Sequence, residues 1–395
     1  MKHLFTTIFG RFARRVSVAT VALVLMSQGV AAQGDSIARG ERPFDFDFLY
    51  TGDFVANMAG GYDQGVAYVG AGTLGFTFDP EKANWYKGGL LRVTGKAAHG
   101  KSPSENLFGD RFFVDNADAG NHVYLYEMWY RQSFNDKFDF TIGLQDINTN
   151  FATHGEAVEF INTAIVMSTI YSNVGTPTFP MTGLGLELGY NINDKWRVQA
   201  CVYDGSVGFT GKEHNLPKDW KLKKQDGYLI AAEGLYSSET AGEYRLGVDY
   251  HTGADDAGTG AQRFGIYANG EKQVGIAKVF AVVAFAPRWK DSYHEAKKND
   301  IYTMINAGVT FHSIFAKRYE DMLGFSCVAN LLNKYTTGQK HETIFELTYK
   351  YRALRMLYVQ PDLQLVLKPA LLPINKDGEE NKAAFGLFVR CGIEL

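Results

Sequence analysis

Residues 244–251 have the sequence Tyr-Arg-Leu-Gly-Val-Asp-Tyr-His, in which apolar side chains alternate with polar or charged ones. Because successive side chains of a β-strand point to opposite faces, this stretch predicts a strand with one apolar and one polar face. The apolar face holds Tyr244, Leu246, Val248 and Tyr250, and the other face holds Arg245, Asp249 and His251. Such a strand is suited to a wall between an apolar and a polar environment.

The same alternation recurs through the chain. Clear examples are 44–57, 89–97, 122–134, 138–145, 196–203, 345–350, 354–368 and 385–395, and weaker ones lie near 66–78, 182–190, 227–236, 263–269, 275–286, 302–311 and 321–331. With 244–251 the count is sixteen, an even number, as in bacterial outer-membrane barrels. In 122–134 we expect Tyr124, Tyr126, Met128 and Tyr130 on the apolar face, opposite Glu127 and Arg131.

The gaps between these stretches alternate in length. With a periplasmic N-terminus, the external loops fall near 58–65, 99–121, 147–181, 205–226, 253–262, 287–301, 332–341 and 369–383. The other connections, such as Asn135-Asp136, Asn191 to Asp194 and Asn269-Gly270, are mostly tight. Long loops outside and short turns inside are typical of outer-membrane barrels. We therefore predict an all-β protein, a sixteen-stranded antiparallel transmembrane β-barrel over residues 44–395.

The N-terminus predicts export. Residues 1–32 carry basic residues, then a short apolar run from Val16 to Met26, then Val30-Ala31-Ala32 before a cut near Gln33. This pattern is typical of a cleaved signal peptide. Residues 33–43 form an N-terminal extension, and the mature protein is expected in the bacterial outer membrane, surrounded by lipid.

Composition excludes several classes of protein. In 395 residues with net charge −3, no apolar run after the N-terminus reaches the roughly 20 residues of a membrane-spanning helix. No basic stripe indicates a nucleic-acid partner. The three cysteines lack CxxC spacing and the nine histidines lack HExxH, so neither a metal nor a cofactor is predicted. Gly70 to Gly75 fits GxGxxG, but it lies inside an alternating strand and does not open a helix.

Several motifs also resemble a known family. They include His99-Gly100-Lys101-Ser102-Pro103-Ser104-Glu105-Asn106, Leu125-Tyr126-Glu127-Met128-Trp129, Ile142-Gly143-Leu144-Gln145-Asp146, Val202-Tyr203-Asp204-Gly205 and Gln360-Pro361-Asp362-Leu363-Gln364. In order and spacing the chain resembles the OprB-type carbohydrate-selective porins from about Tyr50 to its C-terminus. The resemblance implies a sixteen-stranded barrel that passes monosaccharides such as glucose by diffusion. Two departures are the terminal Leu395, where the family tends to end in an aromatic residue, and the apolar run from Thr163 to Met167.

The candidate residues for the substrate path are of two kinds. Charged side chains predicted to face the lumen are Arg92, Lys96, Glu127, Arg131, Arg197, Arg245 and Asp249. Loop residues expected at a constriction are Asp146, Phe151 and His154 in the longest loop, 147–181, and Glu105 and Asn106 in the loop before it. Mixed charges and aromatic rings suit sugar hydroxyls, which donate and accept hydrogen bonds, whereas a ring of one sign favours ions. The alternatives are that the charges form a self-satisfied wall network and that the long loop only caps the outside.

These observations predict a passive channel for small carbohydrates and not an enzyme. Two alternatives stay open, a general small-solute porin and an outer-membrane barrel hydrolase. The second requires a serine beside a histidine, and the isolated candidates Ser102, Ser133, His99 and His154 lack a GxSxG motif. The expected assembly is a monomer or a homotrimer.

Overall fold

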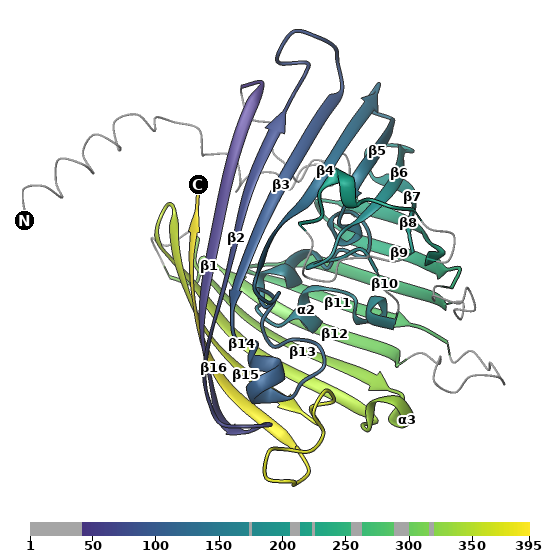
Figure 1. Ribbon diagram of the computed structural model, residues 1–395. Helices are drawn as coiled ribbons and strands as arrows, with labels where there is room; N and C mark the ends of the chain where they lie inside the picture. The colour runs from purple at the N-terminus through teal and green to yellow at the C-terminus, as the bar shows by residue number, and fades with distance from the viewer. Residues whose placement is uncertain are drawn as a thin grey trace, which may run out of the picture.

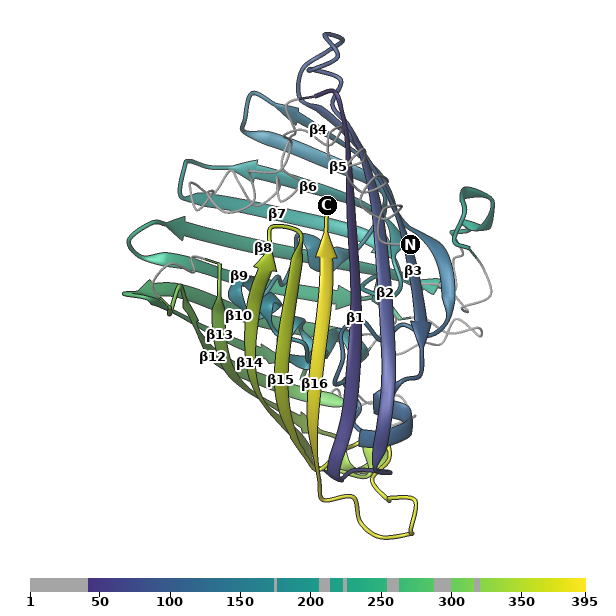
Figure 2. The same cartoon turned by 90° about the vertical axis from the view of Figure 1, so that its left-hand side faces the viewer.

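The computed structural model describes residues 42–173, 176–205, 214–222, 226–253, 263–287, 300–315 and 320–395. Its sixteen strands form one closed antiparallel barrel (Figures 1 and 2). The first eight are β1 (Phe44–Gly60), β2 (Gly65–Phe78), β3 (Gly89–Gly100), β4 (His122–Phe134), β5 (Phe138–Gln145), β6 (Gly183–Asn191), β7 (Trp196–Asp204) and β8 (Tyr228–Ser238). The others are β9 (Gly242–His251), β10 (Arg263–Val274), β11 (Ala277–Phe285), β12 (Ile301–His312), β13 (Met322–Leu332), β14 (His341–Leu354), β15 (Leu357–Leu367) and β16 (Ala383–Glu394). The predicted fold class is confirmed.

The first and last strands close the barrel. β1 pairs with β16 from Leu49 opposite Glu394 to Gly60 opposite Ala384, and with β2 on its other side. Closure pairs the backbone groups that an open sheet would leave at its edges, which is what a strand structure requires in lipid. The predicted signal peptide, residues 1–32, and residues 33–41 of the extension lie outside the described residues.

The short turns follow the predicted pattern with one correction. Asn135 and Asp136 both have positive φ, 50° and 55°, as a two-residue hairpin turn of the primed type requires. The turn predicted at Asn269-Gly270 is wrong, because β10 continues to Val274 and the chain reverses at 275–276. Glu271, in this extension, accepts a hydrogen bond from the backbone of Glu156 inside the barrel, which holds the longer strand in place.

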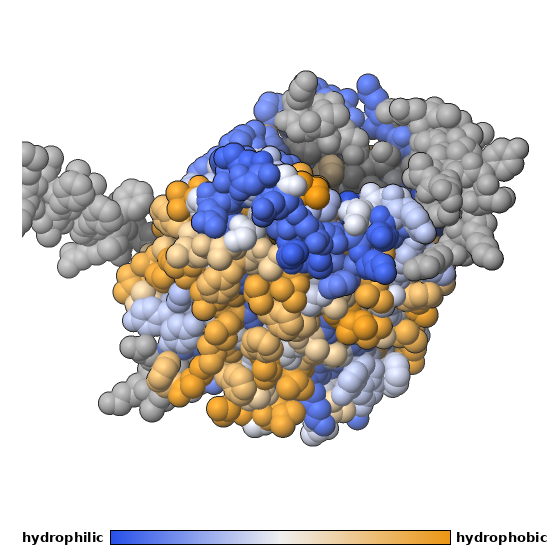
Figure 3. Space-filling view, turned by 90° about the horizontal axis from the view of Figure 1, so that it is seen from below, coloured by the Kyte–Doolittle hydropathy of each residue, from blue (hydrophilic) through white to orange (hydrophobic). Residues whose placement is uncertain are grey.

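The outer face of the barrel is apolar. Large side chains exposed on it include Phe54, Leu74, Ile142, Val198, Leu246, Val283, Phe325, Leu347 and Leu387. Figure 3 shows a broad hydrophobic surface bordered at one edge by hydrophilic residues. Among the described residues, no helix is long and apolar enough to cross a membrane.

The prediction for 122–134 is partly wrong because β4 contains a β-bulge. Thr94 pairs with Glu127 but the next residue, Gly95, pairs with Leu125, so Tyr126 is an extra residue. Since side chains alternate with period two, one extra residue exchanges the faces beyond it. Tyr124 and Tyr126 therefore point into the barrel, where they are 4% and 5% exposed.

Short helices lie inside the ring of strands (Figure 1). Four belong to residues 146–182, which we call the inward segment: η3 (Ile147–Thr149), η4 (Gly155–Glu159), α2 (Thr163–Val166) and η5 (Thr169–Asn173). The connection 101–121, here the mouth segment, contains η2 (Ser104–Phe108). Two further short helices are η6 (Pro217–Asp219) and α3 (Lys334–Thr337).

Candidate functional site

The inward segment crosses the barrel interior and is fixed to one half of the wall. Its backbone and side chains bond to β8 at Glu233, β9 at Arg245, β13 at Asn330, β14 at Glu346 and β15 at Gln364. These bonds run from Asn150 to Thr169. The expectation that the longest loop folds inward is thus fulfilled, and the alternative that it only caps the outside is excluded.

Apolar packing accounts for the unexpected run from Thr163 to Met167. Ala164 and Ile165 have no exposed surface and belong to a buried cluster with Phe280 of β11, Met304 of β12 and Val328 of β13. Burial of the Ile165 side chain stabilises the segment by roughly 1.5–3 kcal/mol, and burial of the Ala164 methyl group by less. The run is apolar because it holds the segment against the wall, and it does not line the pore.

A cluster of mixed polarity lies where β3 and β4 meet the two ends of the inward segment. Lys96 is partly exposed, and its Nζ lies 3.6 Å from the Tyr126 ring centroid and 4.4 Å from that of Phe179. The Tyr126 hydroxyl donates to Asp146, which also accepts from the Phe179 backbone at 3.2 Å. Partly exposed Glu127 is on the same inner face. We call Lys96, Tyr126, Glu127, Asp146 and Phe179 the constriction cluster, after the role that we propose for it below.

Electrostatics in this cluster are set by burial. Asp146 is 7% exposed, and burial raises the pKa of its carboxyl group, while the Tyr126 hydroxyl, Lys96 and two backbone N–H groups act in the opposite direction. The Lys96 ammonium over two aromatic rings is a cation–π arrangement. The cluster therefore offers a donor, acceptors and ring faces within a few ångströms.

Three predicted arginines are held within wall networks. Arg92 donates to Asp47 at 2.9 Å and to Thr77 and Thr94 at 3.0 Å each. Arg197 makes two bonds to Asp139, at 2.7 and 2.9 Å. Arg131 donates to Thr141 at 3.1 Å and, with Arg197 and Phe151, borders a polar cavity of about 10 Å³, which has room for about one water molecule.

Two further predicted residues are covered by the inward segment. Arg245, 5% exposed, bonds to Glu233 at 2.7 Å, Glu243 at 3.1 Å and the Asn150 carbonyl at 3.1 Å. Asp249 is 6% exposed and packs beside Gly265, whose missing Cβ leaves room for the carboxylate. Both residues lie in the wall network and not at an open surface.

Phe151 and His154 require a correction. We expected them at the constriction, but they are 1% and 3% exposed, inside the packed segment. The His154 Nδ1 lies 2.9 Å from the Ile165 carbonyl oxygen, and burial lowers the pKa of the ring to about 4. Glu105 and Asn106 lie on η2 in the mouth segment; Glu105 is exposed and Asn106 donates to the Ser102 carbonyl at 2.8 Å.

Sequence reasoning missed the residues that the inward segment does expose. Val158 is 57% exposed although the segment is enclosed by the barrel, and its neighbour Glu159 is partly exposed. Thr149 is exposed in the same way. No periodicity in a loop of short helices marks these positions, so only the packed structure identifies them.

Three of the four residues considered for hydrolysis have other partners. The Ser102 hydroxyl donates to Asp118, His99 Nε2 lies 3.2 Å from the Tyr50 hydroxyl, and His154 bonds to a backbone carbonyl. Within the described residues, no group of three or more His, Cys, Asp or Glu side chains could hold a metal ion.

Comparisons with known proteins agree with this architecture. Residues 63–391 match the family model described as carbohydrate-selective porin, OprB family. Porin B of Pseudomonas aeruginosa is 24% identical over 388 residues, covering 83% of this chain and 84% of the relative. The high-pH structure of Pseudomonas putida OprB superposes with a TM-score of 0.76 at 19% identity, covering 89% and 94% of the two chains. An anion-selective porin from Comamonas acidovorans gives 0.58 at 9% identity, covering 89% and 99%.

Proposed function

The chain belongs to the OprB family of carbohydrate-selective porins, and we propose that it passes small sugars such as glucose by passive diffusion past the constriction cluster. Membership places the protein in the bacterial outer membrane and makes it a channel and not an enzyme. What we propose is the path that the solute takes through the lumen and the small size of the sugars that pass.

One observation carries the proposed path. The inward segment is bonded to or packed against strands from β7 to β15, and we infer that the open side of the lumen is bordered by β2 to β5 and by the exposed edge of the segment. Lys96 and Glu127 are partly exposed on β3 and β4, and in the inward segment Val158 is exposed and Glu159 is partly exposed. A path bordered by one cation, carboxylates and ring faces suits neutral solutes with many hydroxyl groups. Arg92 and Arg131 are held in the wall by hydrogen bonds and are 8% and 7% exposed, so only a small part of each side chain can border the path.

Liposome swelling tests this proposal. Vesicles containing the purified porin should swell in glucose, more slowly in sucrose and least in an amino acid of similar mass, with the solute chemically unchanged. Equal swelling rates for glucose and a similar-sized amino acid would favour the alternative, a general small-solute porin. No swelling in any solute contradicts the channel proposal.

The assembly is either a monomer or a homotrimer. A solved relative in fold, OmpT of Vibrio cholerae, is described in its trimer form. Chemical cross-linking in native outer membranes distinguishes the two, because a homotrimer yields dimer and trimer bands at low cross-linker. We retain the prediction that residues 1–32 are a cleaved export signal, which mass analysis of the mature protein tests.

A further inference from the structure

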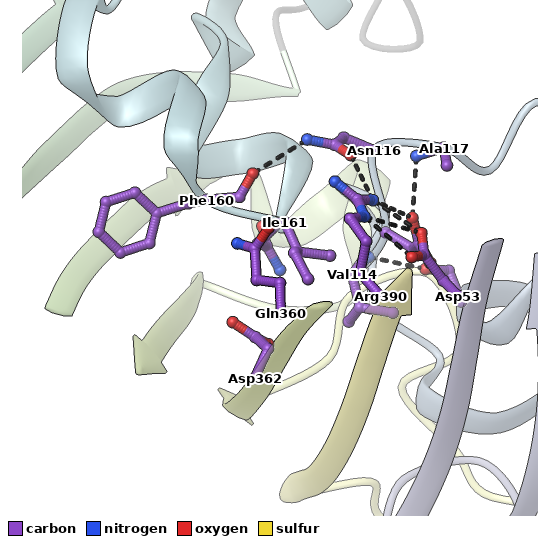
Figure 4. Close-up of polar contacts among 12 residues, drawn as sticks. Asp53, Val114, Asn116, Ala117, Phe160, Ile161, Gln360, Asp362 and Arg390 are labelled. Carbon is purple, nitrogen blue, oxygen red and sulfur yellow. Dashed lines mark hydrogen bonds and ion pairs between the residues drawn. The ribbon is translucent and has the colours of Figure 1, made fainter. Parts of the chain in front are cut away.

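The inward and mouth segments meet the wall of β1, β14, β15 and β16 at one buried place (Figure 4). Asn116 of the mouth segment bonds through its backbone N–H to the Ile161 carbonyl at 2.9 Å, and through its side chain to the Phe160 carbonyl at 3.1 Å. We call this junction the latch. Its polar side chains are Asp53, Asp115, Asn116, Asn162, Glu346, Gln360, Asp362, Gln364 and Arg390.

Glu346 is the main attachment point of the inward segment. Its Oε1 accepts from the Ile161 N–H at 2.6 Å, and its Oε2 accepts from the Asn162 N–H at 2.9 Å. Two neighbouring bonds complete the attachment, from Asn162 to Gln364 at 2.8 Å and from Gln360 to the Glu159 carbonyl at 2.9 Å. Residues 159–162 are thus fixed to the wall directly beside the exposed Val158.

Asp362 and Glu346 are two buried carboxyl groups at neighbouring positions of the inner face. Asp362 is 1% exposed, and its Oδ1 accepts from Gln364 at 3.1 Å. Its Oδ2 is buried without a hydrogen-bond partner, and Asp362 lies diagonally across from Glu346 on the inner face, because Glu346 pairs with Gln364 and Thr348 pairs with Asp362. Two ionised carboxylates have only acceptors, so a bond between them needs one shared proton.

The surrounding charges do not replace this proton. Arg390 of β16 faces the pair, but its N–H groups are engaged by Asp53 of β1 at 2.7 to 3.1 Å, by Asp115 at 3.1 Å and by Asn116 at 2.7 Å. Burial raises the pKa of the Asp115 carboxyl, the nearby Asp53 acts in the same direction and Arg390 opposes them.

On the other side of the latch, Lys350 of β14 pairs with Glu159 of the inward segment at 2.9 Å. Thr348, also on β14, lies opposite Asp362. The buried carboxyl groups of the latch therefore outnumber its cations.

We propose that Glu346 and Asp362 are positioning residues that hold residues 159–162 through one shared proton, so that loss of this proton loosens the segment and makes channel closure depend on pH. With both groups ionised, two adjacent buried negative charges repel, and Glu346 is displaced from the two backbone N–H groups. The inference rests on the proposed function in one respect, which is that Val158 and Glu159 border the proposed water path.

Two variants separate this role from simple packing. Asp362→Asn supplies a permanent N–H donor to Glu346, so it mimics the protonated pair at every pH. Glu346→Gln removes the charge and leaves one acceptor oxygen. The Ile161 and Asn162 N–H groups each need an acceptor, so one of them loses its bond. The control is Glu394→Gln, which removes a carboxylate of β16 that pairs with Arg352, away from both segments.

The test is single-channel recording in potassium chloride between about pH 5 and about pH 9, a readout that does not depend on sugar passage. We expect closing events to become more frequent with rising pH in the wild type and in Glu394→Gln. They should be independent of pH in Asp362→Asn, and frequent at every pH in Glu346→Gln. Wild-type channels without pH dependence, or Asp362→Asn channels that retain it, overturn the proposal.

Infrared titration of the wild type provides evidence that does not need a folded variant. The carbonyl stretch of a buried protonated carboxyl group should be present at neutral pH and disappear in parallel with the rise in closing events. Its absence at neutral pH contradicts the shared proton. If the carbonyl band behaves as expected but liposomes do not swell in glucose, the shared proton of the latch is supported and the proposed sugar function is contradicted.

Discussion

A single inserted residue decides the chemistry of the constriction cluster. Without the bulge in β4, Tyr126 would face lipid and Lys96 would keep only the Phe179 ring, whose centroid lies 4.4 Å from its Nζ. With the bulge, the Tyr126 ring lies 3.6 Å from the Lys96 ammonium and its hydroxyl reaches Asp146. Bulges often redirect a side chain beside a functional site, and this one changes which residues a solute meets.

Replacing Lys96 with alanine should alter selectivity. The variant removes the partly exposed cation, so ion preference should shift towards cations and glucose block of the ion current should weaken roughly fivefold, the equivalent of about one net hydrogen bond. Arg92→Ala and Arg131→Ala should have smaller effects, because wall residues hold both side chains. Reversal potentials and sugar block in planar bilayers measure both properties.

The matched control is Lys137→Ala, which removes a cation from the exposed turn between β4 and β5. It should leave selectivity and sugar block as in the wild type. If Lys96→Ala behaves like this control, the water path lies elsewhere in the lumen.

Glycines in the wall allow long inner side chains to lie flat. At Gly189 of β6 a Cβ atom would overlap the Arg197 guanidinium and the Asp139 carboxylate. Gly189→Ala should therefore displace Arg197 and destabilise the barrel by about 1–3 kcal/mol. Urea unfolding in lipid vesicles measures this loss, and Gly234→Ala, where nothing lies within 4 Å of the added atom, is the control. Equal stability of the two variants contradicts the role of Gly189.

At the scale of single elements, the strength of alternation reflects what each strand packs against. β11 was a weak prediction because both of its faces are apolar: Phe280, Val282 and Ala284 point inwards, and Val279 and Val283 point outwards. The inner residues are apolar because the inward segment covers them. The strand was recognisable from sequence, but the reason for its pattern depends on a contact with residues more than a hundred positions earlier.

The inward segment should be sensitive to acid through His154. Burial holds the pKa of this ring at about 4, below its ordinary value of 6.5, so the folded segment keeps it neutral. Between those values an unfolded segment binds a proton that the folded one does not. The contribution of neutral His154 to the free energy of unfolding is therefore fully present above pH 6.5. It decreases by on the order of 3 kcal/mol as the pH falls towards about 4.

Thermal unfolding near neutral pH and at about pH 4.5 measures this effect. In His154→Gln, whose amide can still donate to the Ile165 carbonyl, the midpoint should change less with pH than in the wild type. His214→Gln is the control, because His214 also bonds to a backbone carbonyl, that of Val123 at 2.7 Å, but is exposed. A His154 variant with unchanged pH dependence would refute the assignment.

For the whole molecule, alternation predicted the fold and the side of most residues but not their accessibility. Arg92, Arg197 and Arg245 face inwards as expected, yet each is nearly buried by partners on adjacent strands or by the inward segment. The face of a strand residue follows from its own position, whereas its exposure depends on how residues 146–182 fold. For the same reason Phe151 was misplaced and Val158 was not recognised.

The two faces of the barrel should therefore respond oppositely to the same substitution. Val93 lies near the middle of β3 and faces outwards, because its cross-strand partners are Phe76 and the exposed Met128. Val93→Arg places a charge in lipid and should cost roughly 2–4 kcal/mol, with a lower yield of assembled barrel.

Thr73→Arg adds the same charge on β2, but next to Lys96 on the inner face. It should assemble normally and reduce conductance, because the added side chain occupies the lumen and not the bilayer. Folded fractions in vesicles, followed by heat-dependent gel mobility, and single-channel conductance measure the two outcomes. If Thr73→Arg fails to assemble while Val93→Arg assembles normally, the inner and outer faces have been assigned the wrong way round.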